Sequence, residues 1–251
     1  MKRLTGFFSA LALTMPVMAE TTIAQTGAEL STESSQLSNG SPDWNELSLR
    51  IHRKRGPRDV KELTLTQTRR FGLDDQQISG LYAAPITDKL TATFSANVSP
   101  SHRVLARHGI DGTLQYEFAP GWLAHAGLGD RRYDNVNVTQ GSLILEHYFS
   151  SFSVSAAWRP VRALGVNASS SELRGSYYYG DSNFIGLIVS SGQEATTVSA
   201  NTVLLADVRA AALLGRHWLG RQWSLSYAIS TTRQGNFYNR NSVRLGAQYL
   251  F

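Results

Sequence analysis

Hydrophobic and polar residues alternate over short segments along most of the chain. The final segment, residues 241–251, has apolar side chains at every second position and polar or small residues between them. A period of two predicts a β-strand, because successive side chains of a strand point to opposite faces. A strand with one apolar and one wet face suits a closed transmembrane barrel, since closure pairs every backbone group and lipid covers the apolar face. The apolar positions are Val243, Leu245, Ala247, Tyr249 and Phe251.

Thirteen segments of this kind lie between Trp44 and Phe251, and the alternation is clearest at 90–98 and 223–230. A tilted strand needs about nine to eleven residues to cross a bilayer, which matches these segments. The predicted fold class is all-β, a closed antiparallel transmembrane β-barrel of about 12–14 strands. A soluble β-sandwich is the alternative, although its strands are usually shorter.

An odd number of strands conflicts with the even number that bacterial single-chain barrels use. Two solutions remain open. Residues around 22–30 form a fourteenth strand, or the segment that starts at Trp44 lies outside a wall of twelve strands. We favour fourteen.

The predicted connections fall into two classes. Phe251 is placed on the periplasmic side, and counting back from it makes the short turns periplasmic and the longer connections extracellular, as is usual for such barrels. The connection 71–75 is an exception, because it is extracellular and short. The predicted periplasmic turns are 56–59, 85–88, 119–121, 149–151, 180–182 and 219–222. The predicted long loops are 99–109, 130–140, 161–171, 192–203 and 232–241.

Aromatic residues gather near the ends of the predicted strands. Barrels in membranes carry such girdles at both interfaces, so the set favours a membrane protein over a soluble one. The predicted girdle consists of Tyr116, Phe118, Trp122, Tyr148, Phe149, Phe152, Trp158, Tyr179, Phe184, Trp218, Trp223 and Tyr249.

The N-terminus has the features of a secretory signal peptide. Lys2 and Arg3 precede an apolar run that ends in small residues before a predicted cleavage after Ala19, and the run is too short to span a bilayer. Residues 1–19 are therefore the predicted signal peptide, 20–41 a flexible leader or weak first strand, and 42–251 the barrel. The predicted location is the outer membrane of a Gram-negative bacterium, after removal of the signal peptide.

The amino-acid composition limits which reactions and binding partners are plausible for the chain. The chain has no cysteine, so disulfides and thiol chemistry are excluded. The formal charge of +5 falls to +3 without Lys2 and Arg3, because 22 basic residues then face 19 acidic ones. This charge is too small to indicate nucleic-acid binding. Arginine outnumbers lysine by 20 to 4, and arginine is the better partner for phosphates and carboxylates, which lipopolysaccharide carries.

With the strands placed, the chain resembles the YaiO family of outer-membrane barrels. The resemblance rests on LTQTRRFGLDD, on LGDRRYDNVNV followed by QGSLILEHYF, on SYYYGDSN and on the final NRNSVRLGAQYLF. It implies an outer-membrane barrel of about 12–14 strands without catalytic residues to assign. Related domains follow helical repeats in exopolysaccharide export proteins, so an export partner is possible, although this chain has no 34-residue helical period. The final aromatics, Tyr249 and Phe251, also resemble the signal that the barrel-assembly machinery recognises.

Charged side chains are predicted to line the interior. Charges inside a membrane usually pair with one another or line a water path. Two interpretations are therefore open. The charges line a channel selective for ions or sugars, or they form a structural network of arginine and glutamate that fills a narrow barrel. The residues predicted to point inward are Arg50, His52, Asp111, Glu117, Glu146, Arg159, Arg174 and Arg244. Another group, predicted near the outer rim as possible ligands for lipid phosphates, is Arg103, Arg107, Arg131, Arg132 and Arg240.

Catalysis is the alternative. His102, His108, His125, His147 and His217 are candidate bases, and His147 shares the predicted lipid-facing row of Leu143 and Leu145. A position in the interface near the turn 149–151 also explains His147. No nucleophile-elbow or metal-binding motif is present, and no cofactor or metal is predicted. We therefore predict a non-enzymatic barrel that acts as a narrow passage or export accessory for anionic or saccharide solutes. The alternatives are a lipid- or saccharide-modifying enzyme and a purely structural or surface-interaction barrel.

Overall fold

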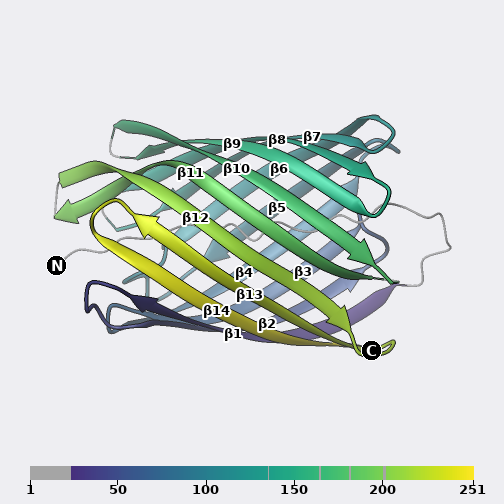
Figure 1. Cartoon of the computed structure of the whole chain (residues 1–251), viewed down its shortest axis with the longest axis horizontal. Coiled ribbons are helices and arrows are strands. Elements are labelled where there is room, and N and C mark those ends of the chain that lie inside the picture. The colour runs from purple at the N-terminus through teal and green to yellow at the C-terminus, as the bar shows by residue number, and fades with distance from the viewer. Residues whose placement is uncertain (1–23, 135, 164, 181, 200–201) are drawn as a thin grey trace.

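The computed structural model describes residues 24–134, 136–163, 165–180, 182–199 and 202–251. The predicted signal peptide lies outside the described residues. Fourteen strands follow one another along the chain and form one closed antiparallel barrel (Figure 1). They are β1 (Gln25–Leu37), β2 (Trp44–Lys54), β3 (Val60–Arg70), β4 (Leu73–Pro85), β5 (Leu90–Val98), β6 (His108–Ala119), β7 (Trp122–Arg132), β8 (Asn137–Phe149), β9 (Phe152–Ala163), β10 (Val166–Tyr179), β11 (Asn183–Ser199), β12 (Thr202–Trp218), β13 (Trp223–Gln234) and β14 (Tyr238–Leu250).

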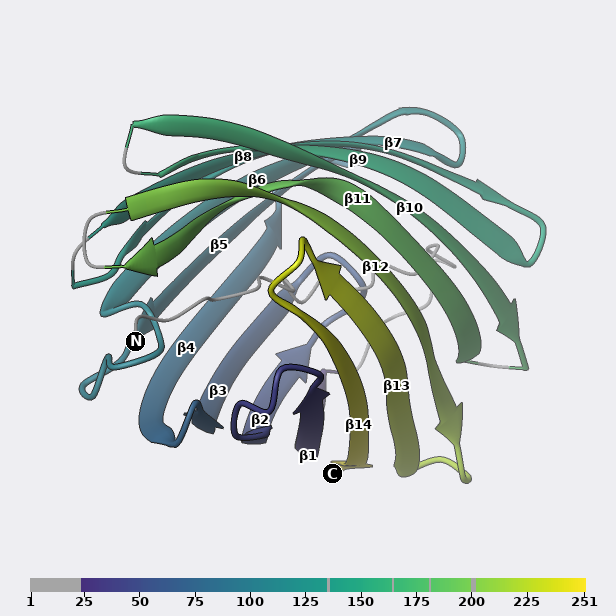
Figure 2. The ribbon, with the colours of Figure 1, turned by 60° about the vertical axis from the view of Figure 1, so that its left-hand side comes forward.

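The first strand closes the barrel. β1 lies between β2 and β14, and Ala28 is in register with Ile51 on one side and Tyr249 on the other (Figure 2). The preferred count of fourteen strands is therefore confirmed. The wall begins at Gln25 rather than at residue 42, so the segment 20–41 supplies a first strand rather than a flexible leader, and the strand at Trp44 belongs to the wall. Ser, Thr and Glu fill much of β1, and only Ala28 and Leu30 show its apolar face.

The predicted alternation decides which way side chains point. Large apolar residues cover the outside of the barrel, among them Leu30, Leu145 and Leu245, all of which are exposed on the isolated chain. Polar residues at the positions between them face the interior. In a bilayer the outer apolar surface is covered by lipid rather than by protein. No helix among the described residues is long and apolar enough to cross a membrane.

An aromatic belt runs around the outside of the barrel at the end that holds Phe251, which we call the C-terminal rim. Its rings contact one another in sequence from β6 to β13, with centroid distances between 4.0 and 6.2 Å. The belt consists of Phe118, Trp122, His147, Phe149, Phe152, Tyr177, Tyr179, His217 and Tyr227.

Three members of the predicted girdle face inward instead. Phe149 points outward, so its neighbour Tyr148 must point to the interior, because a strand alternates its side chains. The same alternation turns Phe184 and Trp218 inward, and Phe184 is buried. The girdle prediction was therefore wrong for these three residues.

The connections at the C-terminal rim agree with the predicted short turns. At the opposite rim, however, only the connections 38–43 and 99–107 are long, and the predicted loops at 130–140, 161–171 and 192–203 are largely strand. Thr139 pairs with Arg162, and Gln193 pairs with Asp207, so these polar segments continue the hairpins. Polar residues on both faces hide the alternation from the sequence, because such a hairpin extends into water on both sides.

Candidate functional site

The interior of the barrel holds most of the charged side chains that lie away from the rims. Strand alternation places every residue predicted to point inward on this face. These residues do not form one cluster. They divide between the wall around β1 and the wall from β6 to β10. Glu117 lies near the C-terminal rim, where its Oε1 accepts a hydrogen bond from the backbone N–H of Gly121 at 3.3 Å.

A cluster centred on Glu29 crosses the seam where the first and last strands meet. The Glu29 carboxylate forms an ion pair with Arg50 from β2, and its Oε2 lies 3.6 Å from Arg216 Nη2 of β12. Ser226 of β13 donates a hydrogen bond to Glu29 Oε1 at 3.1 Å. Arg50 also reaches Glu62 of β3, with Nη1 at 3.4 Å from Oε2. Four strands besides β1 are therefore tied to one carboxylate, directly or through Arg50.

Space for this carboxylate comes from Gly246 of β14. A Cβ atom at Gly246 would lie 2.5 Å from Ser226 Oγ and 3.0 Å from Glu29 Oε1. Any side chain there would therefore push Glu29 and Ser226 apart. His52 packs equally tightly against Gly27, where a Cβ atom would lie 2.8 Å from His52 Cε1.

The opposite wall carries two ion pairs and one contact between a histidine and a carboxylate. Arg159 approaches both carboxylate oxygens of Glu172, at 3.5 and 3.4 Å. Arg131 Nη2 lies 3.1 Å from both oxygens of Asp111. His125 Nε2 lies 3.3 Å from Glu146 Oε2. The sequence predicted Arg159, Asp111 and Glu146 here but missed Glu172, Arg131 and His125 as their inward partners.

Two inward arginines have no carboxylate partner among the described residues. Arg244 Nη2 donates a hydrogen bond to Ser31 Oγ at 3.0 Å, and Arg174 Nε donates to Ser176 Oγ at 3.4 Å. Arg174 Nη2, Arg216 Nε and His52 Nδ1 are buried and have no hydrogen-bond partner among the side chains and backbone described. Buried polar groups of this kind are usually satisfied by water. The interior is therefore polar, and the guanidinium groups of Arg174 and Arg244 form no ion pair with a described carboxylate, although Glu33 is in register with Arg244.

The rim opposite Phe251 is narrowed by a packed cluster and by a folded loop. Trp44 packs against Tyr238 and Phe71, and the guanidinium groups of Arg70 and Arg240 lie 5.1 and 5.0 Å from its ring centroid. Arg240 and Arg131 both lie near the rim opposite Phe251. Alternation points Arg240 inward onto Trp44, and Arg131 pairs with Asp111 inside, so neither side chain is placed to bind a lipid phosphate from outside.

Asp75 holds the loop 99–107 toward the interior. Its inward carboxylate is 1% exposed and accepts hydrogen bonds from the backbone N–H groups of Arg103, Val104 and Leu105, the first and last at 2.9 and 2.8 Å. His102 Nε2 approaches Asp134 Oδ1 at 2.9 Å and so joins this loop to the next connection. Three donors on one carboxylate give the loop a defined conformation.

Three of the candidate histidines lie in arrangements that differ from a nucleophilic triad. His147 stacks on Trp122 at 4.0 Å, and His217 hydrogen-bonds to Tyr179 and Tyr227, so both belong to the aromatic belt. In the His125 and Glu146 pair, Ser155 lies in register with Glu146 rather than with His125. His125 therefore does not lie between Ser155 and Glu146, as the histidine of a nucleophilic triad does. No three metal-ligating side chains gather within the part of the chain that the structure describes.

Glu29 is the main site residue that sequence reasoning missed. It lies in the segment predicted as a flexible leader or weak first strand, where the period of two is weak. A signal was nevertheless present, because Gly27, Glu29, Ser31, Glu33 and Ser35 alternate with Ala28 and Leu30. Arg216 and Glu62 also lie at inward-facing positions of their strands, so the alternation within those strands could have predicted them as well.

Comparison with known proteins places the chain in a family. The family model described as the YaiO membrane beta barrel domain matches residues 25–197. No curated protein sequence matches the chain.

Several solved barrels share the architecture at low identity. Omp33 of Acinetobacter baumannii aligns with a TM-score of 0.56 and 9% identity, over 90% of this chain and 99% of that one. An anion-selective porin from Comamonas acidovorans aligns with a TM-score of 0.51 and 10% identity, over 92% and 100%. The KdgM porin in complex with disordered oligogalacturonate aligns with a TM-score of 0.50 and 10% identity, over 89% and 99%. These likenesses establish the outer-membrane barrel fold.

Proposed function

Because the chain belongs to the YaiO membrane β-barrel family, we propose that it forms a narrow, water-filled passage for anionic solutes, including acidic saccharides. The observation that carries the proposal is the inward placement of Arg174 and Arg244 without carboxylate partners among the described residues. An anion that passes the interior meets these guanidinium groups, which bind carboxylates and phosphates well.

The size of the wall supports a passage. Barrels of about eight strands are filled by their own side chains, whereas barrels of about sixteen leave an aqueous channel. A wall of fourteen strands lies between these limits. The loop 99–107 and the Trp44 cluster occupy one rim, which supports a narrow passage rather than a wide pore.

Two of the similar barrels point to the same solute class. One is described as an anion-selective porin and another was solved with an oligogalacturonate, which is an acidic saccharide. Inward aromatic residues near the C-terminal rim offer a further surface for sugars. The ring centroid of Tyr178 lies 6.2 Å from that of Tyr148 and 6.2 Å from that of Phe184. Sugar rings pack their C–H faces on aromatic rings, and arginine then binds the carboxylates.

The proposal includes an orientation and excludes catalysis. The C-terminal rim faces the periplasm, the signal peptide is removed on export, and the barrel has no enzymatic activity. The arrangement of Ser155, Glu146 and His125 supports the last point, because the histidine does not lie between the other two.

Planar-bilayer recordings of the refolded protein test the passage. We expect a stable conductance whose reversal potential in a KCl gradient indicates a preference for chloride. Replacing both unpaired arginines (Arg174→Gln and Arg244→Gln) should lower the anion-to-cation permeability ratio by roughly twofold or more. Arg53→Gln is the matched control, since Arg53 is exposed on the outer face of β2 and should leave selectivity unchanged. A folded barrel that conducts no ions would contradict the proposal.

A further inference from the structure

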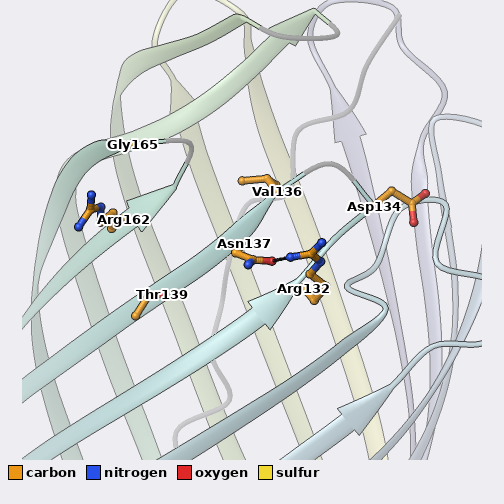
Figure 3. A pocket seen from close by; sticks show the side chains of 7 residues that line it. All are labelled: Arg132, Asp134, Val136, Asn137, Thr139, Arg162 and Gly165. Atoms are coloured by element: carbon orange, nitrogen blue, oxygen red, sulfur yellow. Dashed lines mark hydrogen bonds between the residues drawn. The ribbon is translucent and has the colours of Figure 1, made fainter.

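The outer face of the wall carries a polar cavity next to the rim opposite Phe251. It has a volume of about 500 Å³ and is lined by residues from the ends of β7, β8 and β9 and from the connections beside them (Figure 3). Strand alternation turns Arg132 of β7 and Arg162 of β9 outward, and both side chains are exposed. The remaining lining residues are Asp134, Val136, Asn137, Thr139 and Gly165.

The two arginines flank the same segment of β8. Arg132 is in register with Asn137, and Arg162 is in register with Thr139. Adjacent strands lie about 4.8 Å apart, so the backbones of β7 and β9 are separated by about 10 Å. Arginine side chains that start from these two strands can both reach a group held above β8.

Neither guanidinium forms an ion pair with a described residue. Arg132 Nη1 donates to Asn137 Oδ1 at 2.6 Å, which orients the group without removing its charge (Figure 3). Arg162 has no hydrogen bond or ion pair with the described residues. Two carboxylates lie near the arginines without forming an ion pair with them: Asp130 accepts a hydrogen bond from Thr139 at 3.0 Å, and Asp134 lies 2.9 Å from His102 Nε2. A different rim arginine, Arg69, is held by two bonds to Asp74 at 2.8 and 3.0 Å.

The cavity lies where the outer surface changes from apolar to polar. Below it on the same strands are Leu128, Leu143 and Trp158, which are 74%, 53% and 48% exposed and form part of the lipid-facing surface. A ligand on this face therefore meets acyl-chain contacts on one side and two arginines on the other. Phosphate is the group that paired arginines bind best, through charge-assisted and often bidentate hydrogen bonds.

We propose that Arg132 and Arg162 form a binding site for the phosphate-bearing headgroup of a glycolipid in the outer leaflet, with its acyl chains on the apolar wall below. The site is separate from the passage, because both side chains point away from the lumen. It follows that its loss leaves conductance unchanged, so failure of this proposal and failure of the proposed passage are distinguishable.

Native mass spectrometry of the purified barrel, titrated with bisphosphorylated lipid A, tests the site. The double variant Arg132→Gln, Arg162→Gln should bind lipid A at least about tenfold more weakly than the unmodified protein, since each basic residue near an anionic headgroup contributes to binding. Arg69→Gln is the control and should bind normally, because its guanidinium is already paired with Asp74. Lipid A stripped of both phosphates should bind all three proteins weakly.

Two results would overturn the assignment. One is equal lipid A affinity for the double variant and the unmodified protein, or equal affinity for the phosphate-free lipid. The other is displacement of lipid A by inorganic phosphate at the same micromolar concentration, which would indicate a site for free phosphate. The single variant Arg162→Gln provides a second test if the double variant does not fold, because removing this side chain breaks no described hydrogen bond.

Discussion

At the scale of single residues, the Glu29 carboxylate carries much of the order inside the barrel. Its side chain is 8% exposed and it contacts Arg50, Arg216 and Ser226 from three other strands. A buried charge costs free energy unless it is paired and hydrogen-bonded. The stability of the closure seam should therefore depend on these partners.

Replacing Arg50 by glutamine removes the closest partner of Glu29. We expect the free energy of unfolding to fall by about 1–2 kcal/mol, because a hydrogen-bonded charge is lost in a site that water still reaches. The measurement is the urea midpoint of the refolded protein in lipid vesicles. Arg53→Gln on the outer face of the same strand is the control and should change it little. Equal effects of the two variants would show that the ion pair contributes nothing to stability.

Replacing Gly246 by alanine tests the space that the carboxylate needs. The new methyl group would lie 2.5 Å from Ser226 Oγ and 3.0 Å from Glu29 Oε1, so the hydrogen bond between these residues must break or shift. We expect a loss of about 1–2 kcal/mol in the same unfolding assay. Gly175→Ala is the matched control, since no atom lies within 4 Å of the added Cβ atom at that position. Equal unfolding free energies for the two alanine variants would show that crowding at Gly246 does not affect stability.

At the scale of elements, the loop 99–107 depends on one side chain. Asp75 accepts hydrogen bonds from three consecutive backbone N–H groups of the loop. Asparagine at this position would turn an NH₂ group toward some of these donors and leave them unpaired, at a cost of about 1–3 kcal/mol. Asp75→Asn should therefore loosen the loop without unfolding the wall.

Limited trypsin digestion checks this prediction, because Arg103 and Arg107 are cleavage sites within the loop. We expect cleavage to become roughly tenfold faster in Asp75→Asn, since proteolysis follows the population of the open loop. Asp74→Asn is the control, because Asp74 bonds to Arg69 through its side chain and accepts none of the three loop N–H groups. Unchanged cleavage in Asp75→Asn would mean that other contacts fix the loop.

The strands were predictable wherever lipid lies on one face and water on the other. There the sequence alternates, as in β5 and β13, and the phase of each strand correctly gave the inward direction of Arg50 and Arg244. The prediction failed where both faces are wet, as in the polar hairpin ends of β8, β9 and β11, and in β1 the weak alternation left a strand and a flexible leader as alternatives. Ion-pair partners such as Glu172 for Arg159 were not predictable, because they depend on the register between strands and not on the pattern within one.

At the scale of the whole molecule, closure joins the two ends of the described chain. β1 and β14 pair from Gly27 with Leu250 to Leu37 with Arg240, so the barrel cannot close before the last strand is present. The interior cluster around Glu29 crosses the same seam. Stability and completion of the wall are therefore linked in the folded protein.

Substitution of the final aromatic residue, Phe251, can distinguish a contribution to stability from a contribution to assembly. The Phe251 side chain is 75% exposed and contacts Tyr249 edge-on at 5.4 Å, while its backbone N–H donates to Thr26 O at 2.9 Å. Phe251→Ala keeps that backbone bond, so the unfolding free energy in vesicles should change by no more than about 0.5 kcal/mol. Tyr249→Ala removes the packing on Trp223 at 4.9 Å and should cost about 1 kcal/mol.

In cells we expect Phe251→Ala to have a large effect as well, because the barrel-assembly machinery is predicted to bind the final aromatics, Tyr249 and Phe251, before the wall closes. The amount of folded protein in the outer-membrane fraction should fall several-fold for Phe251→Ala, although the same variant refolds normally in vesicles. If Phe251→Ala instead lowers the unfolding free energy in vesicles enough to account for its loss from the outer-membrane fraction, Phe251 contributes to stability rather than to assembly. Normal assembly of Phe251→Ala would exclude the terminal aromatic as the assembly signal and leave the pairing of β14 with β1 as the remaining determinant.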